Sequence, residues 1–317
     1  DLVEQQRWIE QRLMTASAIW NDWSCRVRVT VTEPNKLNAA KGKVTDLMAE
    51  VSLAANRFEP TSDISRINAA AGRVIPVSGR TIALVDAALD AAAETGGAVD
   101  PTIGSHLEHA GYARDIEQIR ERLVLVRNDP EPDQADWTRV RVDHDLGLVG
   151  IPAGLRLDLG ATAKSWTADL AAHMIANSLN TGVLVEIGGD VAVAGSKRDP
   201  WQVGVSERAG EPGQRIGLTH GGLATSSTAA RRWRTATGEA HHIIDPRTGR
   251  PVEGVLRTAT VWAPSALSAN TASTAAIILG DEAWDYLLDL GLAARLVDND
   301  GRITTIGDWP AARREAA

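Results

Sequence analysis

Residues 156–170 constrain the fold more than any other part of this chain, because they predict a strand, a tight turn and a helix in immediate succession. Residues 156–159 alternate polar and apolar side chains, which is typical of a strand. Gly160 and Ala161 keep the turn narrow and let a ligand approach the backbone. From Thr162 onward, apolar residues recur at helical spacing, so a helix is expected to begin at this turn.

The chemistry of this turn favours an anionic ligand together with a cation. The first backbone N–H groups of a helix have no intrahelical partner and attract anions. Lys164 adds a positive charge to the first turn, and Asp158 places a hard oxygen donor beside it. We therefore expect phosphate and a divalent cation here. An ordinary strand-to-helix turn without a ligand is the alternative that this stretch alone leaves open.

Charge and cysteine content exclude several classes of protein. A formal net charge of −8, without a basic run interleaved with aromatic residues, argues against nucleic acid as a partner. One cysteine, Cys25, excludes an internal disulfide and a multi-cysteine metal site. No apolar run approaches the roughly 20 residues that a transmembrane helix needs. No signal peptide is visible in residues 1–10, which are polar and charged, and Cys25 lies too far inside a strand to be a lipid-bearing N-terminal residue.

Hydrophobic periodicity predicts both helices and strands along the chain. Helical spacing predicts a short helix capped by Ser62 or Asp63 and longer helices at residues 1–14, 38–56, 78–95, 266–279 and 282–290. Alternation predicts strands at residues 25–31, 140–142, 146–151, 183–195, 201–205, 216–218, 257–262, 294–297 and 302–305. Residues 231–234 and 240–244 are expected to form the two arms of a hairpin, and residues 222–228 a hydroxyl-rich turn.

Two residue pairs invite a binding role and leave alternatives open. Gly188 and Gly189 interrupt a strand pattern, which indicates a bulge or the close approach of another molecule. His241 and His242 are adjacent, and adjacent residues on a strand point to opposite faces, so a shared metal is disfavoured. One of the two histidines reaching a ligand as a hydrogen-bond donor or base is the favoured interpretation. The sequence contains no G-x-S-x-G nucleophile elbow, no Walker phosphate loop and no dinucleotide fingerprint.

Seven short motifs, taken together and in order, resemble the ApbE family of FAD:protein FMN transferases. The resemblance runs from about Phe58 to Gly280, roughly two-thirds of the chain. The motifs are SDISRIN at residues 62–68, VDPTIG at 99–104, LDLGATAK at 157–164, EIGGD at 186–190, ATS at 224–226, HIIDPRTG at 242–249 and ANTAST at 269–274. Seven motifs in register are very improbable by chance, so the family is the leading hypothesis.

The resemblance implies an α+β fold with two α/β subdomains and an FAD cleft between them. It implies one ApbE-like flavin transferase domain over residues 21–310, with a seam between its subdomains expected near residues 115–140. Residues 1–20 would form an N-terminal helical extension and residues 311–317 a tail.

The resemblance also implies an activity. FMN would move from FAD onto a threonine hydroxyl of an acceptor flavoprotein, with Mg²⁺, to give a phosphoester and AMP. Two alternatives stay open: an FAD-binding protein of the same fold with weak or lost catalysis, and an FAD pyrophosphatase that releases AMP and FMN. Family members commonly work outside the cytoplasm beside membrane flavoproteins, yet no leader or lipidation site is visible, which leaves the compartment open.

Site residues carry over by their place in the motifs. The resemblance implies catalytic roles for His242, as the base that activates the acceptor, and for Lys164. It implies FAD binding by Asn68, Asp100, Pro101, Thr102, Asp158, Lys164, Gly188, Gly189, Thr225, Ser226, His242 and Ile243. It implies metal binding by Ala161, through its backbone carbonyl, and by Asn270, Ser273 and Thr274.

The chain departs from the family pattern at the expected metal site. Asn270 is a neutral amide where the family has an aspartate, and Mg²⁺ favours carboxylate oxygen. We therefore expect weaker Mg²⁺ binding, by about tenfold if about 1.4 kcal/mol is lost. Ser165 and Ser227 stand where the family has glycines.

Overall fold

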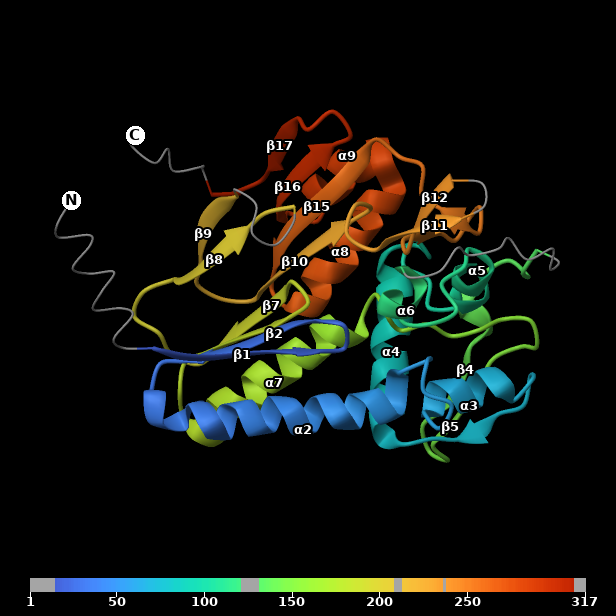
Figure 1. Cartoon of the computed structure of the whole chain (residues 1–317), viewed down its shortest axis with the longest axis horizontal. Coiled ribbons are helices and arrows are strands. Elements are labelled where there is room, and N and C mark those ends of the chain that lie inside the picture. Colours follow the sequence, from blue (N-terminus) through green and yellow to red (C-terminus); the bar gives the residue numbers. More distant parts are fainter. Residues whose placement is uncertain (1–14, 121–130, 208–212, 236–237, 311–317) are drawn as a thin grey trace.

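An eight-stranded sheet forms the centre of the fold in a computed structural model that describes residues 15–120, 131–207, 213–235 and 238–310. The strand order is β1-β2-β6-β7-β10-β15-β16-β17, and every neighbouring pair is antiparallel (Figure 1). The strands are β1 (Ala16–Asp22), β2 (Cys25–Val31), β6 (Val183–Ile187), β7 (Asp190–Ala194), β10 (Gly222–Ser227), β15 (Leu256–Ala263), β16 (Ala293–Asp298) and β17 (Ile303–Ile306).

Three helices cover one face of this sheet. Helix α7 (Ala163–Leu179) contacts β6 and β7, and α8 (Ala266–Leu279) contacts β10 and β15. Helix α2 (Leu37–Ala55) packs across α7 (Figure 1). The buried sides of α7 and α8 carry many alanines, which allow the helices to approach the sheet closely. Both helices therefore lie close to the sheet. The first turn of α7 and later turns of α8 contribute to the site described below.

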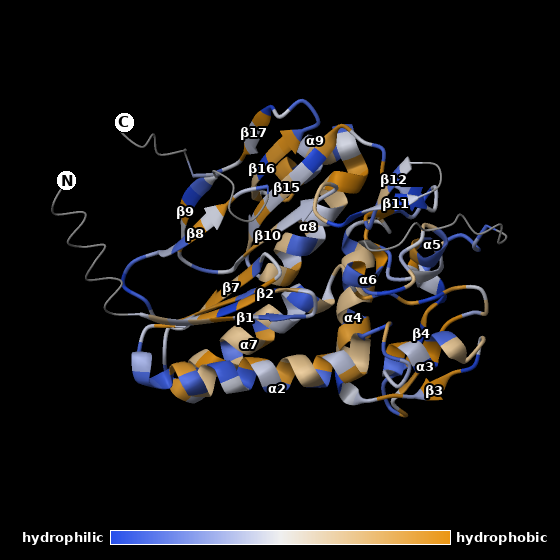
Figure 2. Ribbon diagram, viewed as in Figure 1, coloured by the Kyte–Doolittle hydropathy of each residue, from blue (hydrophilic) through white to orange (hydrophobic). Residues whose placement is uncertain are grey.

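A small hairpin covers the opposite face. Strands β8 (Trp201–Val205) and β9 (Gln214–Leu218) pack with Leu184, Val191 and Val193, whereas Val183 and Val185 of the same strand β6 face α7. Alternate residues of a strand point to opposite faces, so both faces of the central strands are buried. Figure 2 accordingly shows hydrophobic residues along β7.

Most of the remaining elements gather beside α4 (Gly79–Glu94), next to the helix-covered face of the sheet (Figure 1). The helices there are α3 (Asp63–Ala69), α5 (Gly104–His109), α6 (Ile116–Arg120) and the short η2 (Trp137–Arg139). Elsewhere, η1 (Pro34–Lys36) directly precedes α2, and η3 (Gly280–Glu282) and α9 (Ala283–Asp289) follow α8 and contact it. A three-stranded sheet is formed by β3 (Ile75–Pro76), β5 (Leu148–Gly150) and β4 (Arg141–Asp143). Two hairpins are formed by β11 (Arg232–Thr235) with β12 (Gly238–His241) and by β13 (Ile244–Asp245) with β14 (Arg250–Pro251).

Much of the predicted secondary structure is confirmed. Strand β2 and helix α8 have the predicted bounds, and the hairpin at residues 231–244 is present as β11 and β12. Ser62 caps α3 by accepting a hydrogen bond from the Ser65 backbone N–H, at 3.2 Å. Among the described helices, none combines the length and apolar character needed to cross a bilayer.

The predicted N-terminal helical extension is wrong for residues 16–20, which belong to strand β1. Trp23 and Ser24 both have positive φ values, 49° and 53°, which suit a tight hairpin turn. This turn folds β1 back onto β2, so cross-strand pairing decides the conformation of the segment. Residues 1–14 and 311–317 lie outside the described residues.

The predicted turn at residues 222–228 is also wrong, since residues 222–227 form strand β10 inside the sheet. Hydroxyl groups of this strand pair with those of β15: Thr225 with Thr260 at 3.0 Å and Ser227 with Thr258 at 3.1 Å. Cross-strand hydroxyl pairs stabilise a sheet, so serine and threonine here belong to a strand.

Gly188 and Gly189 interrupt the strand pattern, as expected, but they do not form a bulge. They are the two-residue turn between β6 and β7, which pair as an antiparallel hairpin. Their φ values of 64° and 102° lie where glycine is favoured. The predicted strand 183–195 is therefore two strands joined at this turn.

Asp169 of α7 caps helix α8. Its two carboxylate oxygens accept hydrogen bonds from the backbone N–H groups of Ala266, at 2.8 Å, and Leu267, at 2.9 Å. Burial raises the pKa of Asp169, and these two backbone hydrogen bonds act in the opposite direction. The first turn of α8 is thus held against α7.

Replacing Asp169 by alanine is expected to lower the free energy of unfolding by about 2–3 kcal/mol, because two helix N–H groups lose a charged acceptor. Urea denaturation followed by circular dichroism measures this change. Asp46→Ala, on the exposed side of α2, is the matched control and should change the free energy by about 0.5 kcal/mol or less. Equal losses in the two variants would contradict the capping role.

Candidate functional site

A cavity of about 260 Å³ lies where the first turn of α7, the turn after α4, strand β10 and helix α8 meet. Its walls come from both of the largest buried hydrophobic clusters, one around α2 and α7 and one around α8 and β15. The seam predicted near residues 115–140 stays a prediction, and residues 121–130 of it lie outside the described chain. The cavity is lined by twelve residues predicted from the sequence: Asp100, Pro101, Asp158, Ala161, Lys164, Gly188, Thr225, Ser226, His242, Ile243, Asn270 and Thr274.

Four other predicted residues do not line this cavity: Asn68, Thr102, Gly189 and Ser273. The Asn68 amide donates to the Leu157 carbonyl at 3.0 Å, and the Leu157 N–H donates back to Asn68 Oδ1 at 2.7 Å. The Thr102 hydroxyl donates to Asp100 Oδ1 at 2.6 Å. Asn68 and Thr102 thus position neighbouring residues of the cavity wall.

Residues 156–159 do not form the predicted strand, and only Arg156 makes a bridge, to Ile103. Their backbone partners lie in the turn 101–104, where Gly104 donates to the Arg156 carbonyl at 2.9 Å. Pro101 in that turn has no N–H, so a continuous ladder cannot form. A Cβ at Gly104 would lie 2.7 Å from the Arg156 carbonyl oxygen, so only glycine allows this approach.

Asp158 is held by the protein on both carboxylate oxygens. Its Oδ1 accepts from the Gly160 N–H at 2.7 Å, and its Oδ2 accepts from Arg57 Nε. The Arg57 guanidinium lies over the rings of Phe58, at 4.2 Å, and Tyr112, at 4.9 Å. Asp158 therefore fixes the turn before α7, and its carboxylate is not the free hard donor that the sequence suggested.

Three cations line the cavity: Arg57, which is paired with Asp158, and also Lys164 and Arg231. Lys164, in the first turn of α7, donates from Nζ to the Gly160 carbonyl at 2.9 Å. Burial lowers the pKa of Lys164, and the nearby charge of Arg231 lowers it further, while Asp190 acts in the opposite direction. A Cβ at Gly188 would lie 3.4 Å from the Lys164 side chain, so the β6–β7 turn also borders this lysine.

Sequence reasoning missed Arg57 and Arg231, both of which line the cavity. Arg57 directly precedes the stretch that carries the family resemblance, which is a weak signal. Arg231 stands next to Arg232 at the start of a hairpin, and nothing in the sequence distinguishes the partly buried Arg231 from its exposed neighbour.

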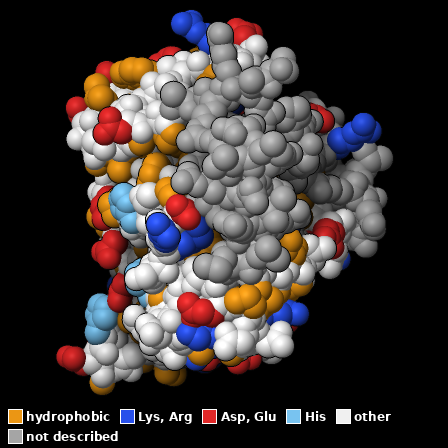
Figure 3. Space-filling model, turned by 90° about the vertical axis from the view of Figure 1, so that its left-hand side faces the viewer, with side chains coloured by type: hydrophobic (Ala, Val, Ile, Leu, Met, Phe, Trp, Pro, Cys, Tyr) orange, Lys and Arg blue, Asp and Glu red, His pale blue; other side chains and the backbone are white. Residues whose placement is uncertain are grey.

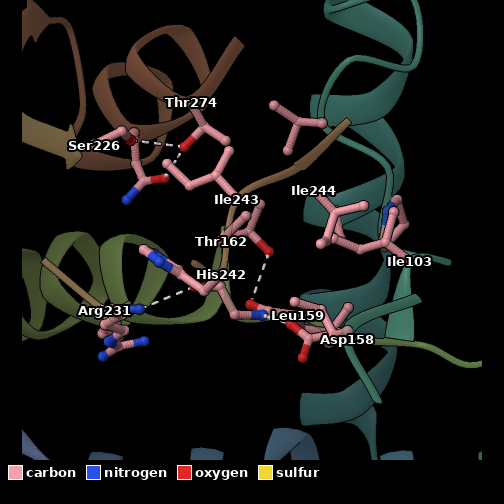
Figure 4. Close-up of a pocket in the computed structure, with 18 of the residues that line it drawn as sticks. Ile103, Asp158, Leu159, Thr162, Ser226, Arg231, His242, Ile243, Ile244 and Thr274 are labelled. Atoms are coloured by element: carbon pink, nitrogen blue, oxygen red, sulfur yellow. Dashed lines mark hydrogen bonds between the residues drawn. The ribbon is translucent and has the colours of Figure 1, made fainter. Parts of the chain in front are cut away.

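His242 is a neutral base in this setting. Burial holds the pKa of His242 well below its usual value, and the positive charges of Arg231 and Lys164 lower it further. Its Nδ1 is buried and has no hydrogen-bond partner among the described residues. Figure 4 shows His242 and Arg231 on the same side of the cavity.

His241, by contrast, is engaged elsewhere. Its Nε2 donates to the Val252 carbonyl at 3.0 Å, and its Nδ1 accepts from the Ile243 N–H at 3.3 Å. Only His242 of the two lines the cavity. The two rings therefore have separate surroundings.

Hydroxyl and amide groups form one corner of the cavity. Ser226 of β10 and Thr274 of α8 point toward one another, with their hydroxyl oxygens 2.8 Å apart (Figure 4). Ser226 also bonds to the hydroxyl of Ser273, at 2.9 Å. The Thr274 hydroxyl donates to Asn270 Oδ1 at 3.2 Å, and the Asn270 amide donates to Asp190 Oδ1 at 3.0 Å.

Asp190 supplies the carboxylate of this corner. Burial raises the pKa of Asp190 to about 6, while Lys164 and the Asn270 hydrogen bond act in the opposite direction. Within the described residues, no group of three or more His, Cys, Asp or Glu side chains is placed so that it could hold a metal ion. The available donors are thus hydroxyl, amide, backbone and single carboxylate oxygens, which is a set that suits Mg²⁺ better than zinc.

Among the residues that the structure describes, charged side chains of one sign do not gather on the side of the molecule seen in Figure 3. There, acidic and basic side chains of the described residues are interspersed rather than gathered by sign.

Comparison with known proteins identifies relatives of this chain. A model of the ApbE family matches residues 23–296. The FAD:protein FMN transferase of Treponema pallidum is 30% identical over 288 residues, which cover 81% of this chain and 76% of the relative. The FAD:protein FMN transferase of Salmonella typhimurium is 28% identical over 243 residues, which cover 71% and 67%.

Solved structures share the fold. The crystal structure of the ApbE protein from Thermotoga maritima has a TM-score of 0.82 at 25% identity and covers 95% of this chain and 100% of that one. The apo flavinyl transferase ApbE from Pseudomonas stutzeri has a TM-score of 0.76 at 23% identity and covers 92% and 94%. The expected α+β fold is thereby confirmed, whereas its division into two subdomains stays a prediction.

Proposed function

This chain belongs to the ApbE family, and on that premise we propose that it is a transferase that moves FMN from FAD to an acceptor protein. The names of its curated relatives, FAD:protein FMN transferase, support this activity. We further propose that the acceptor group is a threonine hydroxyl and that Mg²⁺ assists.

One observation carries the proposal: a buried neutral base shares a cavity with two cations. His242 presents an unpartnered Nδ1, and Lys164 and Arg231 line the same cavity. Phosphoryl transfer depends mainly on positioning and on neutralising the charge of the phosphates. A threonine hydroxyl has a pKa far too high to ionise alone, so it needs a base within reach.

The proposed reaction replaces one P–O bond of FAD by another. The threonine oxygen attacks the phosphorus of the FMN half of FAD and forms a new P–O bond. The P–O bond to the bridging oxygen breaks, and that oxygen leaves with AMP. The hydroxyl proton passes to His242 Nδ1, and Lys164 and Arg231 stabilise the negative charge on the phosphate oxygens.

The residues present suit a divalent cation of the magnesium type. The backbone carbonyl of Ala161 and the side chains of Asn270 and Thr274 would hold it, as hard oxygen donors at one corner of the cavity. When bound, Mg²⁺ would neutralise phosphate charge and orient the pyrophosphate. Ser273 is buried behind Ser226 and would act only through that hydroxyl.

The proposal is tested by incubating the purified chain with FAD, Mg²⁺ and an acceptor of the Treponema pallidum enzyme. AMP release is measured by chromatography, and covalent flavin by fluorescence on a denaturing gel. Both signals together support transfer. AMP without labelled acceptor would indicate an FAD pyrophosphatase, and neither signal despite FAD binding would indicate a binding protein; either outcome overturns the proposal.

Replacing Lys164 by methionine is expected to weaken FAD binding by about 10- to 100-fold, because a charge-assisted contact to phosphate is lost while the side-chain length is kept. Quenching of flavin fluorescence measures the Kd. Lys43→Met on α2, outside the cavity, is the control and should leave the Kd unchanged. Unchanged affinity in Lys164→Met would contradict the placement of phosphate at this turn.

A further inference from the structure

Asp190 is a buried carboxylate with one oxygen unused. It begins β7, directly after the Gly188–Gly189 turn, is only 3% exposed and lines the cavity. Its Oδ1 accepts from the Asn270 amide, but its buried Oδ2 has no hydrogen-bond partner among the described residues. A buried carboxylate oxygen without a donor is costly, so Oδ2 gains from any cation that enters the cavity.

The neighbouring cations do not complete it. Lys164 and Arg231 lie near enough to lower the pKa of Asp190, yet neither forms an ion pair with it within the described residues. The Lys164 ammonium instead donates to the Gly160 carbonyl. The carboxylate charge at Asp190 is thus available to a ligand.

Asn270 is oriented by its two neighbours. Its Oδ1 accepts from the Thr274 hydroxyl, so its amide nitrogen must face Asp190. Asn270 therefore acts as a hydrogen-bond donor toward the carboxylate, and it holds Asp190 in place. The chain Ser226–Thr274–Asn270–Asp190 connects three elements, β10, α8 and β7, through hydrogen bonds alone.

We propose that Asp190 is the anionic ligand for a hard divalent cation in this cavity, and that Asn270 positions Asp190 instead of supplying charge itself. This inference rests on the proposed function, whose magnesium it assigns to a particular carboxylate. It also changes the expectation that Asn270 weakens Mg²⁺ binding. Position 270 lacks a negative charge, but Asp190, which is hydrogen-bonded to Asn270, supplies one.

The test measures Mn²⁺ binding to the metal-free full chain without FAD, from the electron paramagnetic resonance signal of free Mn²⁺, with Mg²⁺ as competitor. Asp190→Asn is expected to weaken Mn²⁺ binding by at least about tenfold. The double variant Asp190→Asn with Asn270→Asp keeps an amide–carboxylate hydrogen bond with its direction reversed. It should recover Mn²⁺ affinity to within about threefold of the original chain.

Glu186→Gln is the matched control on the same hairpin. Glu186 is also a buried carboxylate, but Arg26, at 2.6 Å, and Arg28, at 2.9 Å, pair with its two oxygens. Its replacement should leave Mn²⁺ affinity unchanged. Circular dichroism and Tm establish that each variant is folded before binding is compared.

Three outcomes would overturn the inference: no Mn²⁺ binding by the original chain, unchanged binding by folded Asp190→Asn, or a double variant that binds no better than Asp190→Asn. The last result would mean that a disturbed hydrogen-bond network, not a lost charge, weakens binding. A chain that binds Mn²⁺ through Asp190 yet releases no AMP from FAD would support this inference while overturning the proposed transfer.

Discussion

Replacing His242 by glutamine is expected to lower kcat for FMN transfer by about 100- to 10,000-fold, because the acceptor hydroxyl loses its general base. FAD should still bind, since Lys164 and Arg231 remain in the cavity. AMP release and acceptor labelling at saturating FAD measure the loss. His241→Gln is the matched control, because its ring bonds to the Val252 carbonyl outside the cavity, and its kcat should change no more than about threefold.

The pH dependence provides a second readout for His242. Burial and the two nearby cations hold its pKa well below the usual value of 6.5, so the imidazole is neutral at and above that pH. Mg²⁺ is kept saturating at every pH, because Asp190, whose pKa is raised to about 6, would otherwise lose the metal first. Under that condition the rate should persist as pH falls through 6.5 and decline only when the lowered pKa of His242 is reached. This acid limb should be absent from the residual rate of His242→Gln. Equal losses of kcat in the two histidine variants would contradict the role of a base.

Replacing Arg57 by methionine is expected to lower the free energy of unfolding by about 3–5 kcal/mol, because it leaves the Asp158 carboxylate buried without its cation. The side chains of Arg57 and Asp158 are only 6% and 12% exposed. The loss includes the contacts of the guanidinium with Phe58 and Tyr112. Urea denaturation measures the change.

The exposed pair between Arg250 and Glu131 is the control for this prediction. Their side chains are 76% and 79% exposed, so Arg250→Met should change the free energy of unfolding by about 1 kcal/mol at most. The double variant Arg57→Met with Asp158→Asn should recover part of the loss, since the unpaired charge is removed. A loss of less than about 1 kcal/mol in Arg57→Met would contradict the importance of the buried pair.

Local periodicity was sufficient for the long helices and for most strands. Helix α8 and strand β2 follow from the spacing of their apolar residues, because that spacing is a property of the segment itself. Strand β10 does not, since its serines and threonines are stabilised by hydroxyl partners on β15, some 30 residues away. The strand predicted at residues 156–159 is absent for the opposite reason. Their polar and apolar residues alternate as in a strand, but the segment beside them is a turn that contains Pro101.

The site also combines features that the sequence predicts with features that depend on contacts between distant elements. The motifs placed twelve predicted residues on one cavity, because family motifs report what lies near a shared ligand. They did not single out Asp190, although it ends the motif at residues 186–190. Its role depends on which way the Asn270 amide faces, and that orientation is decided by Thr274, a residue on another element from Asp190. Hydrogen-bond direction is a three-dimensional property that a sequence pattern does not carry.

The carboxylate of Asp169 has a consequence for ligand selection. It joins α7, which carries Lys164, to the first turn of α8, which carries Asn270. These hydrogen bonds link the two helices directly, so the protein itself helps to fix the distance between the cationic and the oxygen-rich ends of the cavity. A ligand that matches this spacing loses little entropy of ordering on association. Asp169 lines no part of the cavity, yet through these two hydrogen bonds it favours ligands whose anionic groups match the spacing between the two helices.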